Sequence, residues 1–194
     1  MFLRRRKVSL QTARLILRLP EPADFRHWAD LRSQSADFLR PWEPVWSEDH
    51  LTRRAFGARV RWAAQSAEQG SALPFLLIRA ADGVLLGAVT LDHIRRGPSQ
   101  TATLGYWIGA AHARQGFMRE AVAAVVEHAF WTLDLSRLEA ACLPENAASR
   151  GLLEKSGFKY EGVAQSYLQI AGRWRNHVLY ACLRNDRRGR TDAG

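Results

Sequence analysis

The sequence predicts one domain of the α/β (α+β) class, with a mixed central sheet flanked by helices. Two observations lead to this class. Apolar residues alternate along short segments in the first half, which is typical of strands, and strand-like and helix-like segments alternate through the second half. The 194 residues are 47% hydrophobic, enough for one sizeable core, and no linker-like stretch divides them. We therefore expect residues 1–194 to form a single domain.

The first half is predicted to be an antiparallel sheet with helices. Residues 14–19 alternate like a strand, and residues 21–33 combine an early proline with helical spacing. After a Trp-rich loop over 38–46, residues 50–70 predict one or two helices. The segments PFLLIRA and VLLGAVTLDHI, joined by ADG, predict a hairpin, because an Asp-Gly pair supplies the required turn geometry. Residues 101–109 predict a further strand.

The second half places Gly116 at a junction between a strand and a helix. Residues 117–133 are apolar at most positions, which predicts a helix largely buried against the sheet. A strand, a helix and two further strands are then predicted at about 137–143, 146–156, 158–168 and 174–183. At the start of a helix, main-chain N–H groups lack intrahelical partners and the helix dipole favours an anion.

Charge and cysteine usage limit the function classes. The net charge of +9 includes basic clusters near both ends, which predict flexible tails at about residues 1–10 and 185–194 and leave RNA contact open. Cys142 and Cys182 lie in apolar runs, which favours buried thiols in a reducing cytoplasm. We find no membrane span or secretion signal, and the six histidines show no ligand spacing. A cytoplasmic protein without a metal is expected.

The segment ARQGFMREAV, residues 113–122, is the candidate anion site. A glycine lets main-chain N–H groups approach a phosphate without a Cβ in the way, and Arg114 and Arg119 add positive charge around Gly116. A turn that merely separates two elements is the alternative, since one glycine between a strand and a helix is a weak signal.

Three longer segments together resemble the GNAT superfamily of N-acetyltransferases, and within it the ribosomal-protein-alanine N-acetyltransferases. They are LGYWIGAAHARQGFMREAV, PENAASRGLLEKSGFKYEG and GRWRNHVLYA, in the family's order and spacing. FLRPWEPV is similar to the branch that acts on the fifth small-subunit ribosomal protein. The resemblance extends from about residue 12 to 183 and implies the GNAT acyltransferase fold, with a sheet of about six to seven strands.

This resemblance implies transfer of an acetyl group from acetyl-CoA to the N-terminal amine of a protein, by direct attack in a ternary complex. The family's specificity points to the N-terminal alanine of a small-subunit ribosomal protein. Two alternatives stay open: an acetyltransferase for a small-molecule amine, and a non-enzymatic ribosome-assembly or RNA-contact factor that retains the fold. A net charge of +9 is poorly suited to attract polycationic small molecules.

The resemblance also implies where acetyl-CoA binds. Main-chain N–H groups of residues 114–119 would hold the pyrophosphate, although Ala113 and Met118 depart from the family's loop pattern. The strand GYWIG would lie beside the pantetheine, and an N–H near Ile108 would stabilise the oxyanion. Asn146 matches a cofactor-binding asparagine and is equally suited to cap a helix. The cofactor-binding candidates are Trp107, Ile108, Arg114, Gln115, Gly116, Phe117, Met118, Arg119, Asn146 and Ser149.

Ser149 and Glu43 are the catalytic candidates. Some related enzymes carry Glu and Tyr where Ala141 and Leu153 stand here. Ser149 matches a serine that relatives place near the thioester sulfur, and an ordinary first-turn serine is the alternative. Glu43 lies among aromatic residues and prolines, where burial would raise the pKa of its carboxyl and suit it to act as a base; a surface carboxylate, or water acting on an amine of pKa about 7.7–8.0, is the alternative. The expected substrate-binding residues are Trp42, Glu43 and Tyr106.

Overall fold

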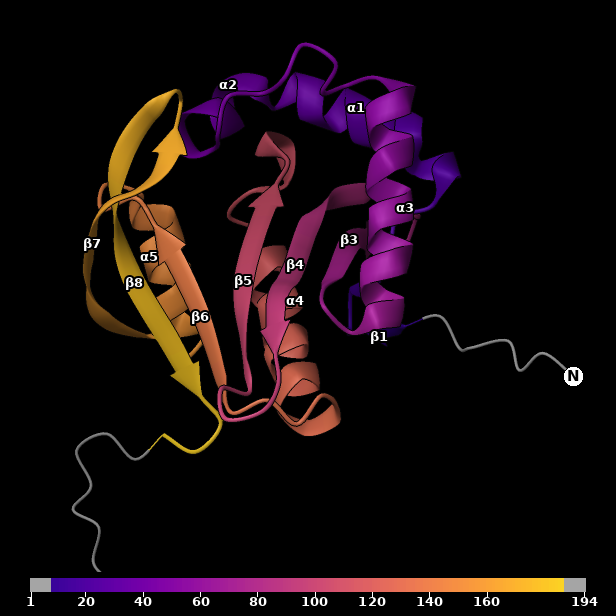
Figure 1. Cartoon of the computed structure of the whole chain (residues 1–194). Coiled ribbons are helices and arrows are strands. Elements are labelled where there is room, and N and C mark those ends of the chain that lie inside the picture. Colours follow the sequence, from indigo (N-terminus) through magenta and orange to yellow (C-terminus); the bar gives the residue numbers. More distant parts are fainter. Residues whose placement is uncertain (1–7, 187–194) are drawn as a thin grey trace, which may run out of the picture.

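The computed structural model describes residues 8–186, which form an eight-stranded sheet with helices on both faces (Figure 1). The strand order is β1-β2-β3-β4-β5-β6-β8-β7. Neighbouring strands are antiparallel except for β5 and β6, which run parallel. This mixed sheet with flanking helices confirms the predicted fold class.

The strands are β1 Ser9–Gln11, β2 Leu15–Arg18, β3 Leu73–Arg79, β4 Leu85–Arg95, β5 Thr101–Ile108, β6 Arg137–Cys142, β7 Lys159–Ile170 and β8 Arg173–Leu183. All except β1 correspond to strands predicted from the sequence. A strand of 3 residues is too short to show an alternating period. The expected tail at residues 1–10 is therefore wrong for residues 9 and 10, which pair with β2. Residues 1–7 and 187–194 lie outside the described part of the chain.

The α-helices are α1 Phe25–Gln34, α2 Ala36–Leu39, α3 Arg53–Gln69, α4 Phe117–Glu127 and α5 Ala147–Lys155. Helix α4 continues as a π-helix over His128–Thr132, and a short 3-10 turn over Arg40–Trp42 follows α2. The stretch over 38–46, expected to be a loop, therefore contains the end of α2 and this turn, both too short to reveal a helical period. Within residues 8–186, no helix has the length and apolar character that a membrane crossing requires.

The sheet separates two cores. Helices α4 and α5 pack on one face through buried residues such as Val122 and Leu153, and α1 and α3 pack on the other through residues such as Trp28 and Phe56. Side chains alternate along a strand, so neighbouring residues of β5 reach different cores. The side chains of Tyr106 and Ile108 pack on the α4 side of the sheet, whereas the side chain of Trp107, the residue between them, packs on the α1 side.

The sheet splits between β5 and β6. Their pairing covers only Thr101–Thr103 of β5 and Arg137–Glu139 of β6, whereas β4 remains paired with β5 as far as Ile108. Figure 1 shows the two strands diverging beyond their paired ends. In the described chain, residues 104–108 thus have no strand partner on the β6 side, and their main-chain polar groups there are available to a ligand.

Besides the β5–β6 pairing, a contact at the open end of the split joins its two sides. The turn between β7 and β8 donates the Ala171 N–H to the main-chain carbonyl of Glu43, at 3.0 Å. Gly172 of the same turn lies beside Val45. Figure 1 shows the segment after α2 next to the tip of the β7–β8 hairpin. The segment that contains Glu43 therefore bridges the split.

Candidate active site

The turn before α4 has the backbone shape of an anion site. Gly116 is the N-cap of α4 with a φ of 81°, a left-handed conformation that favours glycine, and no side chain caps this helix. The N–H groups of the first turn therefore remain available to an anion. Arg114 and Arg119 are exposed beside the turn, whereas the Phe117 and Met118 side chains are buried. Phe117 and Met118 can thus offer main-chain groups rather than side chains.

The pairing of β4 with β5 decides which main-chain groups face the split. The Gly109 N–H donates to the Leu86 carbonyl at 2.8 Å, so it points toward β4. Main-chain groups along an antiparallel strand point alternately to either side, and Trp107 therefore also faces β4. The Ile108 N–H points the opposite way, into the split. Ile108 keeps its predicted availability, whereas the main-chain groups of Trp107 belong to the ladder with β4, and its contact with the cofactor remains a prediction.

Ser149 and Tyr106 meet across the split. The Tyr106 hydroxyl and Ser149 Oγ are 2.7 Å apart, and the Asn146 side chain accepts the Ser149 main-chain N–H at 3.0 Å. Asn146 therefore caps α5, which was one of its two predicted roles. Tyr106 lies with Ser149 on the α4 side of the sheet, and its expected contact with the acceptor remains a prediction.

Burial favours the neutral form of the Tyr106 phenol. Burial raises the pKa of the Tyr106 phenol far above its ordinary value, and the hydrogen bond with Ser149 opposes that rise only partly. Burial likewise raises the pKa of the Cys142 thiol, with a partial opposing effect from Ser149. A neutral Tyr106 that donates to Ser149 Oγ leaves the Ser149 hydroxyl proton free to point elsewhere. The pair can therefore donate a hydrogen bond to a developing thiolate.

Glu43 lies in an ion pair with Arg32. Its two carboxylate oxygens accept from the guanidinium at 2.8 and 2.5 Å, and one of them also accepts from Trp46 Nε1 at 2.7 Å. Arg32 is 4% exposed, and its guanidinium lies 4.4 Å from the Trp46 ring centre and 4.7 Å from that of Trp107. These bonds favour a role for Glu43 in fixing the segment over one in accepting a proton. Its action as a base remains a prediction.

His50 completes this cluster as a neutral ring. It stacks on Trp46 with 4.6 Å between ring centres, and its Nε2 lies 3.2 Å from an Arg32 nitrogen. Burial, followed by the charges of Arg32 and Arg59, lowers the pKa of His50 to about 4. Nε2 can therefore accept a hydrogen bond from Arg32 at neutral pH.

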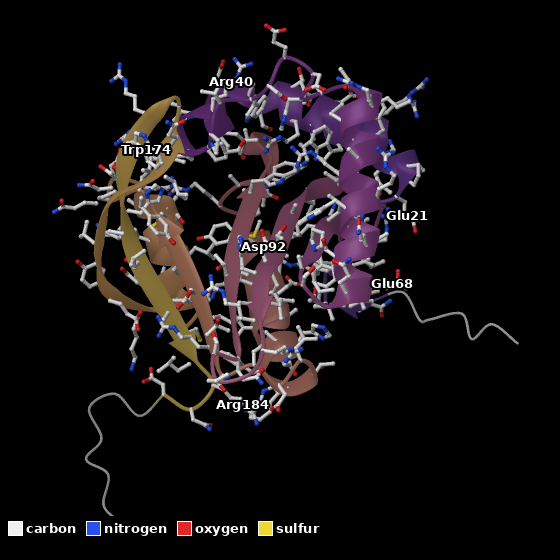
Figure 2. The ribbon with its side chains drawn as sticks, viewed as in Figure 1. Glu21, Arg40, Glu68, Asp92, Trp174 and Arg184 are labelled. Carbon is white, nitrogen blue, oxygen red and sulfur yellow. The ribbon has the colours of Figure 1, made fainter. Side chains whose placement is uncertain are left out.

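Exposed aromatic and apolar side chains surround the bridged end of the split. Trp42, a predicted acceptor residue, is 38% exposed directly before Glu43, and Val45 is 70% exposed. Trp174 is 62% exposed on β8, and Figure 2 shows it near the tip of the β7–β8 hairpin, at the same end of the molecule as Arg40. Such a surface is suited to the apolar part of an acceptor chain.

The sequence matches the family described as an acetyltransferase (GNAT) domain over residues 14–159. The chain belongs to the GNAT acetyltransferase family. It is 37% identical over 175 residues to the [ribosomal protein uS5]-alanine N-acetyltransferase of Escherichia coli (strain K12), covering 90% of each chain. It is also 36% identical over 166 residues to the probable N-acetyltransferase YjcK of Bacillus subtilis (strain 168), covering 86% of this chain and 92% of that protein.

Solved structures agree with this assignment. The ribosomal-protein-S5-alanine acetyltransferase from Vibrio fischeri superposes with a TM-score of 0.86 at 28% identity, over 92% of this chain and 98% of its own. RimJ from Mycobacterium smegmatis, in complex with CoA-disulfide, gives a TM-score of 0.83 at 29% identity, over 92% of this chain and 87% of its own. The GNAT fold and the family resemblance predicted from sequence are thus confirmed.

GNAT acetyltransferases take their acetyl group from acetyl-CoA, which fits the uncapped start of α4 beside the split sheet. Among the described residues, we find no group of three or more His, Cys, Asp or Glu side chains that could hold a metal ion. Cys142 and Cys182 are buried thiols, as predicted. Arg32 and His50 were not predicted as site residues, although this part of the chain is dense in arginine and tryptophan.

Proposed function

We propose that this GNAT acetyltransferase transfers the acetyl group of acetyl-CoA to the N-terminal alanine of a small-subunit ribosomal protein of the uS5 type. The observation that carries the proposal is the split between β5 and β6, into which the Ile108 N–H points. The relatives from Escherichia coli and Vibrio fischeri, both named for that alanine, support the choice of acceptor.

In this proposal, the N–H groups of residues 114–119 hold the pyrophosphate of acetyl-CoA, and the free edge of β5 lies beside its pantetheine. The Ile108 N–H donates to the thioester carbonyl oxygen, which becomes the oxyanion. The acceptor amine attacks the carbonyl carbon, and the C–S bond then breaks. Ser149, supported by Tyr106, donates a hydrogen bond to the sulfur as it leaves as a thiolate, which then takes its proton from solvent.

The proposed acceptor site lies under the segment that contains Trp42 and Glu43, at the open end of the split. Because both oxygens of Glu43 are engaged by Arg32, water is the simplest proton acceptor for the attacking amine. An α-amine has a pKa of about 7.7–8.0 against about 10.4 for lysine, and is thus partly neutral at physiological pH. This difference favours N-terminal amines over lysine side chains.

A peptide assay tests the proposal. The protein is incubated with acetyl-CoA and three peptides of one sequence, which begin with alanine, with acetylated alanine, or with acetylated alanine and an added lysine. Free thiol release and a mass gain of one acetyl group are expected only for the free alanine. Equal acetylation of the lysine peptide would contradict the proposed acceptor, and the absence of transfer to all three would contradict an N-terminal acetyltransferase.

Two further expectations belong with this proposal. A cytoplasmic location follows from a ribosomal-protein acceptor. Contact of the basic chain ends with ribosomal RNA also remains a prediction, and most of the residues concerned lie outside the described part of the chain. A binding experiment with ribosomes at two salt concentrations tests this contact. It compares the full chain with a variant that lacks residues 1–7 and 187–194.

A further inference from the structure

We propose that Arg14 is a positioning residue for the phosphate-binding turn and that its Nη2 group is an additional ligand of the pyrophosphate. This inference rests on the proposed binding of acetyl-CoA at Gly116. Arg14 precedes β2 and lies 101 positions before Gln115 in the sequence. It therefore reaches the turn from a distant part of the chain.

Arg14 contacts the turn on both sides of Gly116. Its Nη1 donates to the Gln115 carbonyl at 3.1 Å, and its guanidinium carbon lies 4.4 Å from the centre of the Phe117 ring. A Cβ added to Gly116 would lie 3.3 Å from Nη2. The guanidinium thus fixes the carbonyl before Gly116 and the ring after it, while Nη2 faces the glycine itself.

Glu120 holds Arg14 in this position. The Arg14 Nε–H donates to Glu120 Oε2 at 2.6 Å, the Arg14 main-chain N–H donates to Oε1 at 2.8 Å, and the Thr12 hydroxyl also donates to Oε1. Burial favours a raised pKa for Glu120, but the hydrogen bonds from Thr12 and Arg14 outweigh it, and the pKa is lowered. Glu120 is therefore a carboxylate in the first turn of α4.

A carboxylate so close to a phosphate site needs a cation beside it. Glu120 in the first turn would repel a pyrophosphate bound at the same helix end, and Arg14 offsets that charge while its Nη2 lies beside Gly116. The Arg14 side chain is 46% exposed, so a ligand can reach it. Loss of the Arg14 side chain is expected to weaken recognition of the pyrophosphate specifically, because that side chain contacts Gln115, Phe117 and Glu120 around the turn.

The test compares two acetyl donors. Acetyl-CoA carries the pyrophosphate, whereas S-acetylpantetheine carries the same thioester and arm without it. For Arg14→Gln we expect the KM of acetyl-CoA to rise by about tenfold, the scale of one charge-assisted hydrogen bond. The KM of S-acetylpantetheine and kcat with either donor should be unchanged, because neither depends on the pyrophosphate.

Arg184→Gln is the matched control. Arg184 makes the same three kinds of contact, with the Asp134 carboxylate, the Phe130 carbonyl and the Trp131 ring. It does so beyond the other end of α4, about 20 Å from Gly116 at a rise of about 1.5 Å per residue, and Figure 2 shows it at the end of the molecule opposite Arg40. Both KM values should match those of the wild type.

Three results would overturn the inference: an unchanged KM for acetyl-CoA, an equal rise for both donors, or the same selective rise in Arg184→Gln. If Arg14→Gln does not fold, Arg14→Lys replaces it. A wild-type KM for acetyl-CoA in Arg14→Lys would also contradict the inference, because an ammonium cannot reproduce the forked contacts of the guanidinium. The Gly116→Val variant distinguishes a wrong role for Arg14 from a wrong pyrophosphate site at Gly116. If Gly116→Val weakens acetyl-CoA binding but Arg14→Gln does not, only the role of Arg14 is wrong; if neither does, the proposed turn itself is wrong.

Discussion

At the scale of single residues, Ser149 and Tyr106 carry the proposed stabilisation of the leaving thiolate by a hydrogen bond. Thiols have a reference pKa of about 8.5, so help for the thiolate should matter only moderately, and we expect Ser149→Ala to lower kcat by about a hundredfold or less. The capping bond of α5 joins the Asn146 side chain to the Ser149 main-chain N–H and does not involve the Ser149 hydroxyl, so the stability of Ser149→Ala should change little. We expect Tyr106→Phe to lower kcat as well, and the double variant to lose less than the product of both effects.

Measurements of kcat and of the urea midpoint on the same preparations check this prediction. Independent, multiplicative effects of the two substitutions would show that the hydroxyls do not act as a unit. A normal kcat with a lowered midpoint in Ser149→Ala would assign Ser149 to the structure of α5 alone.

Glu43 is expected to matter more for stability than as a base. Glu43→Gln leaves the buried guanidinium of Arg32 without its carboxylate, and a broken pair of this kind costs about 3–5 kcal/mol when fully buried, less here because Glu43 is partly exposed. We expect a clearly lower urea midpoint and, among folded molecules, an unchanged pH profile of kcat. A kcat that falls and loses its acidic limb in Glu43→Gln, where the rate rises as a base loses its proton, would instead identify the carboxylate as the base.

The lowered pKa of His50 predicts how the free energy of unfolding depends on pH. Its folded pKa of about 4 lies below the ordinary value of 6.5, so the unfolded chain binds the proton more readily between these values. The contribution of His50 is fully present above about pH 6.5 and is lost as the pH falls toward about 4. His50→Gln should flatten this part of the stability profile, with the exposed His93→Gln as the control. An equally steep profile in His50→Gln would contradict the assignment.

At the scale of elements, the start of α4 is the decisive junction. Gly116→Val places a branched side chain at a φ of 81° and against the anion site, so acetyl-CoA affinity should fall at least about tenfold. Gly70→Val is the matched control, because Gly70 ends α3 at a φ of 68° with open space around its Cβ position. Calorimetry should show a weakened affinity in Gly116→Val alone, and equal losses in both variants would reduce the effect to backbone strain.

The elements show what sequence can and cannot predict. Apolar patterns and turn residues predicted every strand except β1, and Gly116 was predicted as a site residue because a glycine between a strand and a helix can be recognised from nearby residues alone. Contacts between distant segments could not be found in this way: Arg14 with Gln115, Arg32 with Glu43, and Tyr106 with Ser149. The direction of the Ile108 N–H could not be predicted from the sequence either, because it depends on the register of β4 against β5.

At the scale of the whole molecule, the split sheet brings together parts that no single element contains. One half supplies β5 and the start of α4, the other supplies Ser149 on α5, and the bond from Ala171 to Glu43 bridges them at the open end. The proposed acceptor surface, with Trp42 on one side and Trp174 on the other, lies at the same opening. Family membership establishes an acetyltransferase, and this arrangement is where we expect its substrates to meet.

A crystal structure with CoA and an alanine-initiated peptide tests that claim most directly. We expect the pyrophosphate at Gly116, the pantetheine along the free edge of β5, and the CoA sulfur next to Ser149. In a complex that retains the acetyl group, the thioester oxygen should lie about 2.7–3.1 Å from the Ile108 nitrogen. Coenzyme bound away from the split, or a peptide amine on the opposite side of the sheet from the thioester, would contradict the account.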